Sequence, residues 1–524
     1  MMSYVILICR CFLRGSVQRE AAEREIRWYF MSCLQKQEVS MDILKDLTGI
    51  TGEGFVTDDE SVLSGYASDL SFSAGTKPEA EVCPGTTEEV SRIVKWANEN
   101  NMPLIPVSSP VHLYGSTIPK QGGVIVNMRR FDEIYEIDTV NRFVRIGAGV
   151  SWEKLTAALR EQGMRVILPL TPRSDRSVAT DHLEREVTTS MVYDYGEPTQ
   201  SMEVVFPNGD IFRTGSASAP KFPYSPARGA NPAGPGLDFY RLLQCAQGTM
   251  GIVTWMSLKI QSIPVIDRIK FAALDSIERG TEFLYRILPR RIGQECLILN
   301  RVDLAALLAR DRGEFERYRE SLPPYTLILT LSGLIRRPEE KLTYEENFLK
   351  EVLRNEFSDI VLTDALPGFP GAAGRLMKIL RNPWPAEIPY WKSVPKGGYQ
   401  DLFFIARPER AQEFISVVEE TAGRRSYPFD SIGIYKQPIE HNRACQLQFT
   451  FFYDPGSEAS EAEVRALYRE TFEALHSAGA YFTRPYGDMA PRLYDRAASY
   501  TIALKKVKDL FDPNHIMNPG NLCF

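Results

Sequence analysis

The hydrophobic and polar positions alternate most clearly around residue 205, where they predict a β-hairpin. Residues 202–206 read Met-Glu-Val-Val-Phe, so every second side chain is apolar. The next four residues, Pro-Asn-Gly-Asp, have strong turn chemistry, and Ile-Phe-Arg-Thr-Gly supplies the second arm. A polar segment precedes the hairpin, with charges at Asp181, Glu184, Arg185 and Glu186. Such a segment usually lines a ligand, a partner or solvent.

The segment 77–150 predicts strands that alternate with helices. Short apolar runs indicate strands at 80–84, 103–107, 123–128 and 144–149. Thr86 and Glu89 form a capping box, and apolar side chains then recur at helical spacing. Ser151 is predicted to cap another helix, which Gly163 ends. We therefore expect a βαβ order of elements in this part of the chain.

The pattern of predicted strands and helices changes near Val265. Strand-like runs then alternate with helix-like stretches, and these runs are 268–274, 325–331, 402–406 and 446–453. Ser460 and Glu463 read as a second capping box, which predicts the start of a helix. Pro, Gly and Ala are frequent at 220–236, which predicts a surface loop. We expect this second part to be an α+β cap domain built on an antiparallel sheet.

Composition narrows the class of protein. The 524 residues suffice for two or three domains with sizeable cores. The net charge of -6 gives no basic footprint for nucleic acid. The eight cysteines are scattered without a Cys-x-x-Cys spacing, so they signal no zinc, iron–sulfur or haem site and favour a reduced, cytoplasmic setting. The apolar run 4–9 is too short to span a bilayer and lacks a preceding basic segment, so we expect no membrane span and no secretory signal.

Residues 1–40 differ from the rest of the chain. They contain three of the eight cysteines and have a mixed, poorly periodic pattern. A segment typical of a domain start follows at Met41. We expect an N-terminal extension or an overlong start; a partner-binding helix over 18–30 is the alternative.

The polar segment and the hairpin together resemble a known family. Ser177-Val178, followed by Glu184-Arg185 and the Met-Glu-Val-Val hairpin, is similar to the flavin-binding domain of the vanillyl-alcohol oxidase and para-cresol methylhydroxylase family. The resemblance extends from Lys77 to about Pro264. In that family this segment lies along the FAD. The resemblance therefore implies FAD contacts from Ser177, Val178, Asp181, Glu184 and Arg185.

Two further segments carry the same resemblance. Gly251-Ile252-Val253-Thr254 is similar to a family strand that lies against the flavin; a plain buried strand is the alternative. The Asp-Pro-Asn string that begins at Asp512 and ends in Pro519-Gly520 resembles the family's C-terminal segment, which returns to the flavin domain. The resemblance implies cofactor contacts from Gly251, Ile252, Val253 and Asn518.

The family holds the FAD pyrophosphate in a glycine-rich loop, because anionic phosphates need converging amides without side chains in the way. Here the matching loop keeps only Gly115, and Pro110 lacks an N–H donor. The family's second glycine cluster is replaced by Arg-Ser-Asp-Arg at 173–176. Hydroxyl groups could substitute for the amides; a loop that no longer binds phosphate is the alternative. The loop residues implied to contact FAD are Ser108, Ser109, Val111, His112, Leu113, Gly115 and Ser116.

The family's phenol-oxidising members hold their substrate as a phenolate with tyrosines and an arginine. Tyr114 and Arg484 fall at the matching positions, and Arg484 is also implied to contact the cofactor. A guanidinium there would stabilise a phenolate or an anionic reduced flavin. Thr483 stands where the family has a second tyrosine, and Tyr481 or Tyr486 is a candidate replacement. Core packing of the tyrosines and a surface salt bridge for Arg484 are the alternatives.

Two histidines are candidates for a covalent flavin link. His112 lies in the FAD loop, and His441 lies near the family's other attachment position, where Asn442 aligns slightly better. A structural or solvated histidine is the alternative in both cases. No histidine pair or carboxylate cluster suggests a metal, which weighs against the hydroxyacid-dehydrogenase branch.

We therefore predict an α+β FAD-dependent oxidoreductase. A PCMH-type FAD-binding domain is expected at 41–264 with a C-terminal return at 480–524, and a cap at 265–479. The expected reaction removes a hydride from an alcohol or a para-substituted phenol. The alternatives are an FAD-dependent 2-hydroxyacid dehydrogenase and a flavin-poor structural subunit of a larger redox complex. The electron acceptor would be separate: oxygen, a cytochrome or an electron-transfer protein. The sequence leaves a homodimer open.

Overall fold

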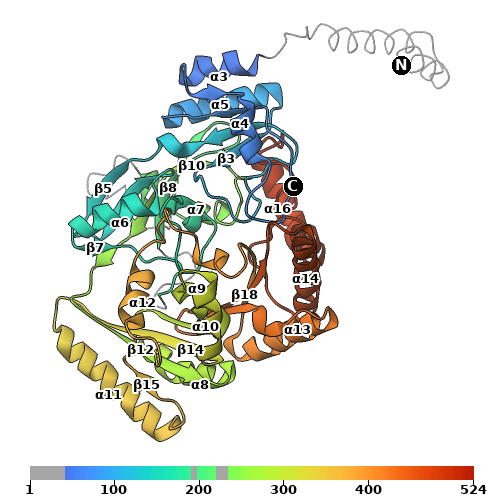
Figure 1. Cartoon of the computed structure of the whole chain (residues 1–524). Coiled ribbons are helices and arrows are strands. Elements are labelled where there is room, and N and C mark those ends of the chain that lie inside the picture. Colours follow the sequence, from blue (N-terminus) through green and yellow to red (C-terminus); the bar gives the residue numbers. More distant parts are fainter. Residues whose placement is uncertain (1–41, 191–197, 220–233) are drawn as a thin grey trace, which may run out of the picture.

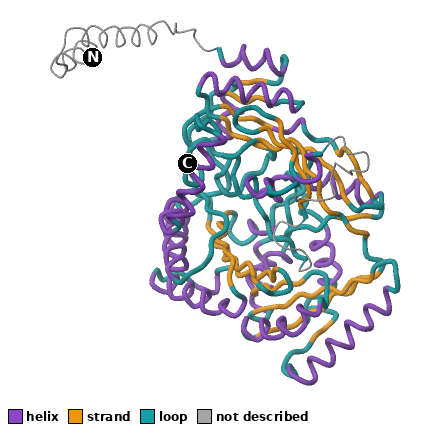
Figure 2. The backbone as a smooth tube through the Cα atoms, turned by 180° about the vertical axis from the view of Figure 1, so that it is seen from behind, coloured by secondary structure: helices purple, strands orange, loops and turns teal. Residues whose placement is uncertain are grey.

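The computed structural model describes residues 42–190, 198–219 and 234–524 (Figure 1). The expectations for residues 1–40, and most of the predicted loop at 220–236, lie outside the described residues. Two small sheets occupy the N-terminal part of the described chain, and one large sheet occupies the part after Pro264 (Figures 1 and 2). Within the described ranges, no helix is both long and apolar enough to cross a membrane.

The first small sheet has the order β1-β2-β4-β3. Its strands are β1 (Val56–Thr57), β2 (Ala80–Val82), β4 (Val124–Asn127) and β3 (Leu104–Val107), and the last three run parallel. The predicted capping box starts helix α5 (Thr87–Asn100), where the Thr86 hydroxyl accepts a hydrogen bond from the Glu89 amide at 3.1 Å. Helix α3 (Ile43–Thr51) precedes β1, and helix α4 (Glu60–Leu63) follows it.

The second small sheet is antiparallel, with the order β5-β6-β10-β8-β9. Its strands are β5 (Ile134–Asp138), β6 (Phe143–Gly147), β10 (Ile252–Lys259), β8 (Thr199–Val205) and β9 (Ile211–Arg213). The predicted hairpin is confirmed, because β8 and β9 pair with Val205 opposite Ile211. Helices α6 (Trp152–Glu161) and α7 (Val178–Leu183) and a short ribbon of β7 (Met164–Arg165) with β11 (Gln261–Ser262) complete this part. One hydrophobic core joins both small sheets.

The large sheet has seven strands, and every pair in it is antiparallel. In spatial order they are β15 (Leu362–Thr363), β12 (Ile266–Leu274), β14 (Tyr325–Gly333), β13 (Cys296–Asn300), β17 (Gly433–Ile439), β18 (Ala444–Tyr453) and β16 (Gly398–Ala406). The predicted α+β cap on an antiparallel sheet is confirmed. The four strand-like runs of the sequence correspond to β12, β14, β16 and β18.

Both faces of the large sheet are covered by helices, because alternate side chains of each strand enter different cores. In β14, Leu327 and Leu329 belong to one core, and Ile328 belongs to the other. The first core also holds side chains from α8 (Ile277–Ile287), α11 (Pro338–Glu356), α13 (Ala411–Arg424) and α14 (Glu458–Ser477). The second holds side chains from α9 (Arg301–Leu308), α10 (Arg312–Ser321) and α12 (Ala372–Arg381).

The start predicted for α14 is wrong by one short turn. The helix begins at Glu458, and the hydroxyl of Ser457, not of Ser460, caps it by accepting a hydrogen bond from the Ser460 amide at 3.3 Å. The hydroxyl of Ser460 instead accepts a hydrogen bond from the Asp454 amide at 3.0 Å. Ser460 therefore ties the preceding turn to the first turn of the helix.

The chain returns to the first sheet at its C-terminal end. After α15 (Met489–Arg496) and α16 (Ala498–Phe511), the tail runs beside β3. The Leu104 amide donates to the Ile516 carbonyl at 2.8 Å, and the Asn518 amide donates to the Leu104 carbonyl at 2.9 Å. Figure 1 shows this red C-terminal segment beside the blue N-terminal elements.

Candidate active site

The loop after β3 presents a row of backbone amides. Among the described residues, none accepts a hydrogen bond from the amides of His112, Leu113, Tyr114, Ser116 or Thr117. Gly115 lies among them with φ of 79°, and a side chain there would come within 2.2 Å of the Ser73 hydroxyl. Backbone amides without acceptors are donors that a phosphate group can use. The loop offers five such donors among the described residues.

Two serines of this loop act inside the protein. The Ser109 hydroxyl accepts hydrogen bonds from the Val111 amide at 3.3 Å and from the Ser177 amide at 3.2 Å. The Ser108 hydroxyl lies 2.5 Å from the Thr180 hydroxyl. These contacts fasten the loop to α7. The hydroxyls of Ser108 and Ser109 thus have partners within the protein, and the substitution of hydroxyls for amides stays a prediction.

The segment that replaces the family's second glycine cluster turns toward the cap. The Ser174 amide donates to the Trp384 carbonyl at 2.7 Å. The buried Arg176 guanidinium donates to the Val111 carbonyl at 3.0 Å and forms an ion pair with Asp181. Arg176 thus connects the loop to Asp181 of α7.

A channel of about 90 Å³ runs between this loop, α7 and the start of β10. Of the residues predicted to contact the cofactor, it is lined by Ser108, His112, Leu113, Ser116, Glu184, Gly251, Ile252 and Val253. A side chain at Gly251 would come within 2.8 Å of Val204, so glycine keeps this wall flat. Cofactor sites usually exceed about 300 Å³, so the channel is narrower than a typical cofactor site.

The other predicted cofactor residues support the channel from behind. The Asn518 side-chain amide donates to the Ser116 carbonyl at 2.7 Å and to the Gln247 carbonyl at 2.6 Å. Asp181 accepts a hydrogen bond from the Trp152 indole at 2.7 Å. Arg185 donates to Gln244 at 3.2 Å. Ser109, Val111, Gly115, Ser177 and Val178 do not line the channel either.

Tyr114 and Arg484, far apart in the sequence, meet at one oxygen atom. The Tyr114 hydroxyl donates to Glu186 Oε1 at 2.8 Å, and Arg484 Nη1 forms an ion pair with the same oxygen at 2.6 Å. The Arg484 side chain is buried, and its guanidinium carbon lies 3.9 Å from the centre of the Phe403 ring. Two donors that converge on one oxygen form a binding position for an oxygen atom with negative charge.

Glu186 was not among the predicted site residues, although its charge was apparent in the sequence. Glu184 ends α7, and Arg185 adopts a left-handed conformation with φ of 53°. This turn separates the two glutamates, so that Glu184 lines the channel and Glu186 lines a second cavity beside the cap. The three successive charged residues were the only sequence signal for this arrangement.

The two glutamates have opposite pKa shifts. Burial raises the pKa of Glu184 above its ordinary value, against the opposing effects of Tyr486 and Arg484. Burial would also raise the pKa of Glu186, but Arg484 and Arg176 outweigh it and hold that pKa below its ordinary value. A pair of acids with opposite shifts is common where one group holds a proton and the other stays charged.

Tyr486 stands beside Tyr114, and its hydroxyl donates to Glu184. Tyr486 is therefore the second tyrosine that the structure brings to Arg484. Tyr481 is 69% exposed and lines none of the cavities described here.

The second cavity, about 70 Å³ in volume, is called here the inner cavity. Tyr114, Arg176 and Glu186 line it from the flavin-binding side. Its aromatic walls come from Tyr390, Trp391, Tyr399 and Tyr435. Its cations are each paired with a carboxylate: Lys392 with Asp401 at 2.5 Å, Arg173 with Asp175 at 3.3 Å, and Arg176 with Asp181. The inner cavity is thus aromatic, and its charges are balanced.

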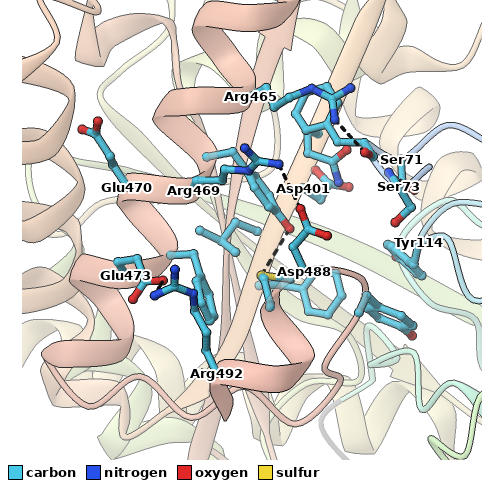
Figure 3. Close-up of a pocket in the computed structure, with 18 of the residues that line it drawn as sticks. Ser71, Ser73, Tyr114, Asp401, Arg465, Arg469, Glu470, Glu473, Asp488 and Arg492 are labelled. Carbon is cyan, nitrogen blue, oxygen red and sulfur yellow. Dashed lines mark hydrogen bonds and ion pairs between the residues drawn. The ribbon is translucent and has the colours of Figure 1, made fainter. Parts of the chain in front are cut away.

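A wider outer cavity of about 690 Å³ opens between α14, β16 and the segment 484–492 (Figure 3). Tyr114, Arg484 and Tyr486 are among its lining residues. Its charged side chains are largely paired, as the dashed lines show: Arg469 with Asp488 at 2.9 Å and Arg492 with Glu473 at 2.6 Å. Because Tyr114 lines the channel and both cavities, it stands where the three spaces meet.

The two candidate link histidines lie in different places. His112 lines the channel, and burial lowers its pKa to about 4. His441 and Asn442 both have positive φ in the turn between β17 and β18, and neither lines the channel. In the described part of the chain, no three or more His, Cys, Asp or Glu side chains gather so that they could hold a metal ion.

Comparisons with known proteins place this geometry among flavoproteins. The family model described as "FAD binding domain" matches residues 78–215. The D-lactate dehydrogenase [cytochrome] of Arabidopsis thaliana mitochondria is 23% identical over 497 residues, which cover 93% of this chain and 81% of that protein. The glycolate oxidase subunit GlcD of Bacillus subtilis is 24% identical over 503 residues, which cover 92% and 97%.

Two solved structures share the fold. The 4-ethylphenol oxidase of Gulosibacter chungangensis superposes with a TM-score of 0.76 at 20% identity, covering 91% of this chain and 95% of its own. The p-cresol methylhydroxylase superposes with a TM-score of 0.78 at 18% identity, covering 92% and 96%.

Proposed function

Since this chain is an FAD-dependent oxidoreductase with the fold and the FAD-binding domain of the vanillyl-alcohol oxidase and para-cresol methylhydroxylase family, we propose that it removes a hydride from an alcohol or a para-substituted phenol. The observation that carries the proposal is the meeting of Tyr114 and Arg484 at one oxygen position. A substrate hydroxyl bound next to that position would have fixed polar partners, and its carbon skeleton would lie between the aromatic walls of the inner cavity.

The chain's own residues supply binding, orientation and proton handling. The loop amides without acceptors would hold the phosphates, with Arg176 fixing the loop through the Val111 carbonyl, and FAD would supply the acceptor for the hydride. Tyr114 and Arg484 fix the carboxylate of Glu186 beside the substrate oxygen. That carboxylate accepts the hydroxyl proton as the carbon–hydrogen bond breaks. Glu184, with its raised pKa, keeps a second proton-binding group at the channel wall.

A 2-hydroxyacid dehydrogenase is the second candidate. It is favoured by the curated relatives named as D-lactate dehydrogenase and glycolate oxidase subunit. Three cations line the inner cavity and could face a carboxylate: Arg173, Arg176 and Lys392. Each of them already has a carboxylate partner, so binding a hydroxyacid would require one ion pair to open. The balanced charge and the aromatic walls favour the first candidate.

The flavin-poor structural subunit loses its main support. That alternative rested on the missing glycines, and the amides of His112, Leu113, Tyr114, Ser116 and Thr117, which have no acceptor among the described residues, would offer the phosphates comparable donors. A separate electron acceptor, a homodimer, the covalent link through His112, the cytoplasmic location and the domain boundaries at 264 and 479 remain predictions.

Anaerobic stopped-flow reduction of the FAD-loaded protein tests the proposal. The panel contains para-alkylphenols, benzylic alcohols and 2-hydroxyacids of similar size. We expect the phenols or the alcohols to bleach the flavin absorbance, and the hydroxyacids to do so far more slowly. Bleaching by hydroxyacids alone would establish the second candidate instead.

A further inference from the structure

We propose that Glu186 determines the charge state of the substrate: it admits a neutral hydroxyl group and rejects phenolates and carboxylates. The inference rests on the proposed function for its setting, because it assigns a substrate class to the same site. It concerns a residue that the family resemblance did not single out.

The position of Glu186 is fixed from both sides. Its backbone amide donates to the Asp181 carbonyl at 2.9 Å, and Arg185 before it supplies the left-handed turn. Its Oε1 atom is held by the Tyr114 hydroxyl and by Arg484. The carboxylate therefore already occupies the oxygen-binding position that a phenolate would need.

The second carboxylate oxygen of Glu186 is available to the substrate. Among the described residues, none donates a hydrogen bond to Glu186 Oε2, and Glu186 lines the inner cavity. An ionised carboxylate accepts hydrogen bonds and donates none. It therefore recognises a hydroxyl group that still carries its proton, as in a neutral alcohol or phenol.

An anionic substrate would meet unfavourable charge at the same place. Glu186 compensates the charge of Arg484, and the cations of the inner cavity have carboxylate partners of their own. A phenolate or carboxylate would have no proton to donate and would place a second negative charge beside Glu186. Like charges in close contact in a buried site disfavour each other strongly.

A plain structural role makes a different prediction. If the ion pair between Glu186 and Arg484 only fastened the cap to the flavin-binding part, removing its charge would alter stability and leave ligand choice unchanged. If Glu186 swung aside for the substrate, anions would bind the unmodified protein well. Ligand binding at two charge states separates these cases.

The test measures binding of 4-nitrophenol to the full-length, FAD-loaded protein by calorimetry, below and above the ligand's own pKa. This ligand changes charge and has no alkyl or alcohol carbon–hydrogen bond from which a hydride could be removed. Phenol, which stays neutral at both pH values, is the control for titration of the protein itself. We expect the nitrophenolate to bind about tenfold more weakly than the neutral form, a factor that corresponds to one like-charge contact of modest strength. Phenol should bind equally at both pH values.

The matched variant is Glu186→Gln, which keeps the side-chain shape and removes the charge. Its preference should vanish or reverse, because the negative charge that repels the phenolate is gone while Arg484 keeps its positive charge. Nitrophenolate binding to the unmodified protein as tightly as the neutral form would overturn the proposal, even if the variant failed to fold. Absence of binding by both ligands would also overturn it. Failure of the proposed function would show separately, as an oxidised flavin that no alcohol or phenol reduces.

Discussion

The rings of Tyr114 and Tyr486 stack with their centroids 4.7 Å apart and their planes 23° from parallel. Tyr114 comes from the loop after β3, and Tyr486 comes from the segment between the cap and the C-terminal helices. Their hydroxyls donate to different glutamates of one turn, Tyr114 to Glu186 and Tyr486 to Glu184. The stack thus joins two distant parts of the chain. Its hydroxyls contact two glutamates whose pKa values are shifted in opposite directions.

Replacement of Tyr486 by Phe should move the pH profile of flavin reduction upward. The variant keeps the stack but loses the hydrogen bond that lowers the pKa of Glu184. A hydrogen bond to a charged group contributes about 1.5–3 kcal/mol, and one pKa unit is about 1.4 kcal/mol, so the upward shift should be about one unit or more. Anaerobic reduction rates at a series of pH values measure it. Tyr481→Phe is the control, and equal profiles for the two variants would contradict the role of Tyr486.

Arg484 and Glu186 should behave as one unit in stability measurements. Arg484→Met leaves a buried carboxylate without its cation, which typically costs about 3–5 kcal/mol. The double variant Arg484→Met/Glu186→Gln removes both charges and should recover most of that loss. Denaturant unfolding of the unmodified protein, Arg484→Met, Glu186→Gln and the double variant, all FAD-loaded, gives the four free energies of the cycle. Additive losses in the double variant would show that the pair is not coupled.

Arg484→Met should also slow flavin reduction. Arg484 fixes the carboxylate of Glu186, the proposed proton acceptor, so its loss should cost a factor on the order of 100, the lower end of what general acid–base catalysis contributes. Tyr114→Phe should cost less, because the ring keeps its contacts with Tyr486 and Phe403. Stopped-flow traces with one substrate compare both variants. Rates equal to those of the unmodified protein would place the reacting carbon away from this side chain.

His182→Leu should flatten the dependence of stability on pH between about pH 4 and 6.5. Burial lowers the pKa of His182 from 6.5 to about 4. The unfolded chain therefore binds a proton in this window while the folded protein does not, and stability falls as the pH falls. The full cost below pH 4 is about 3 kcal/mol, from about 1.4 kcal/mol per pKa unit. Urea unfolding at both ends of the window measures it; an unchanged slope would exclude this origin.

Asn518→Ala should weaken FAD binding. The variant leaves the carbonyls of Ser116 and Gln247 without their donor. An unpaired buried group costs about 1–3 kcal/mol, which corresponds to a loss of FAD affinity of roughly 5- to 150-fold. Equilibrium dialysis with FAD measures the affinity. Asn521→Ala is the control, since Asn521 lies in the same tail but donates to the Asn518 carbonyl at 3.4 Å; equal losses for both would point to the tail as a whole.

The strands and the helix starts were readable from the sequence because they depend on neighbouring residues. The alternation in 202–206 and the turn that follows determine the hairpin locally, and the same holds for the capping box at Thr86. The helix start predicted at Ser460 was wrong because its hydroxyl accepts a hydrogen bond from the Asp454 amide, before the helix, and caps no helix amide. That choice depends on the shape of the preceding turn, which the pattern of residue types does not report.

The site was only partly readable, because its key features are conformational. The missing glycines suggested a weakened phosphate loop, whereas the structure frees the amides of ordinary residues by fastening the loop through Ser109. The role of Glu186 depends on the left-handed turn at Arg185 and on Arg484, which is brought from the far end of the chain. Neither can be inferred from the local sequence around residue 186.

The contact between Asn518 and Ser116 spans 402 residues of sequence. During synthesis, the phosphate loop therefore leaves the ribosome long before the residue that braces it exists. Until the C-terminal tail is synthesised, β3 of the flavin-binding part lacks its pairing with Met517. Stable loading of the cofactor is consequently a late event, which follows translation of the cap and cannot guide its folding. A cell short of FAD would accumulate chains whose cap is complete and whose flavin channel is empty.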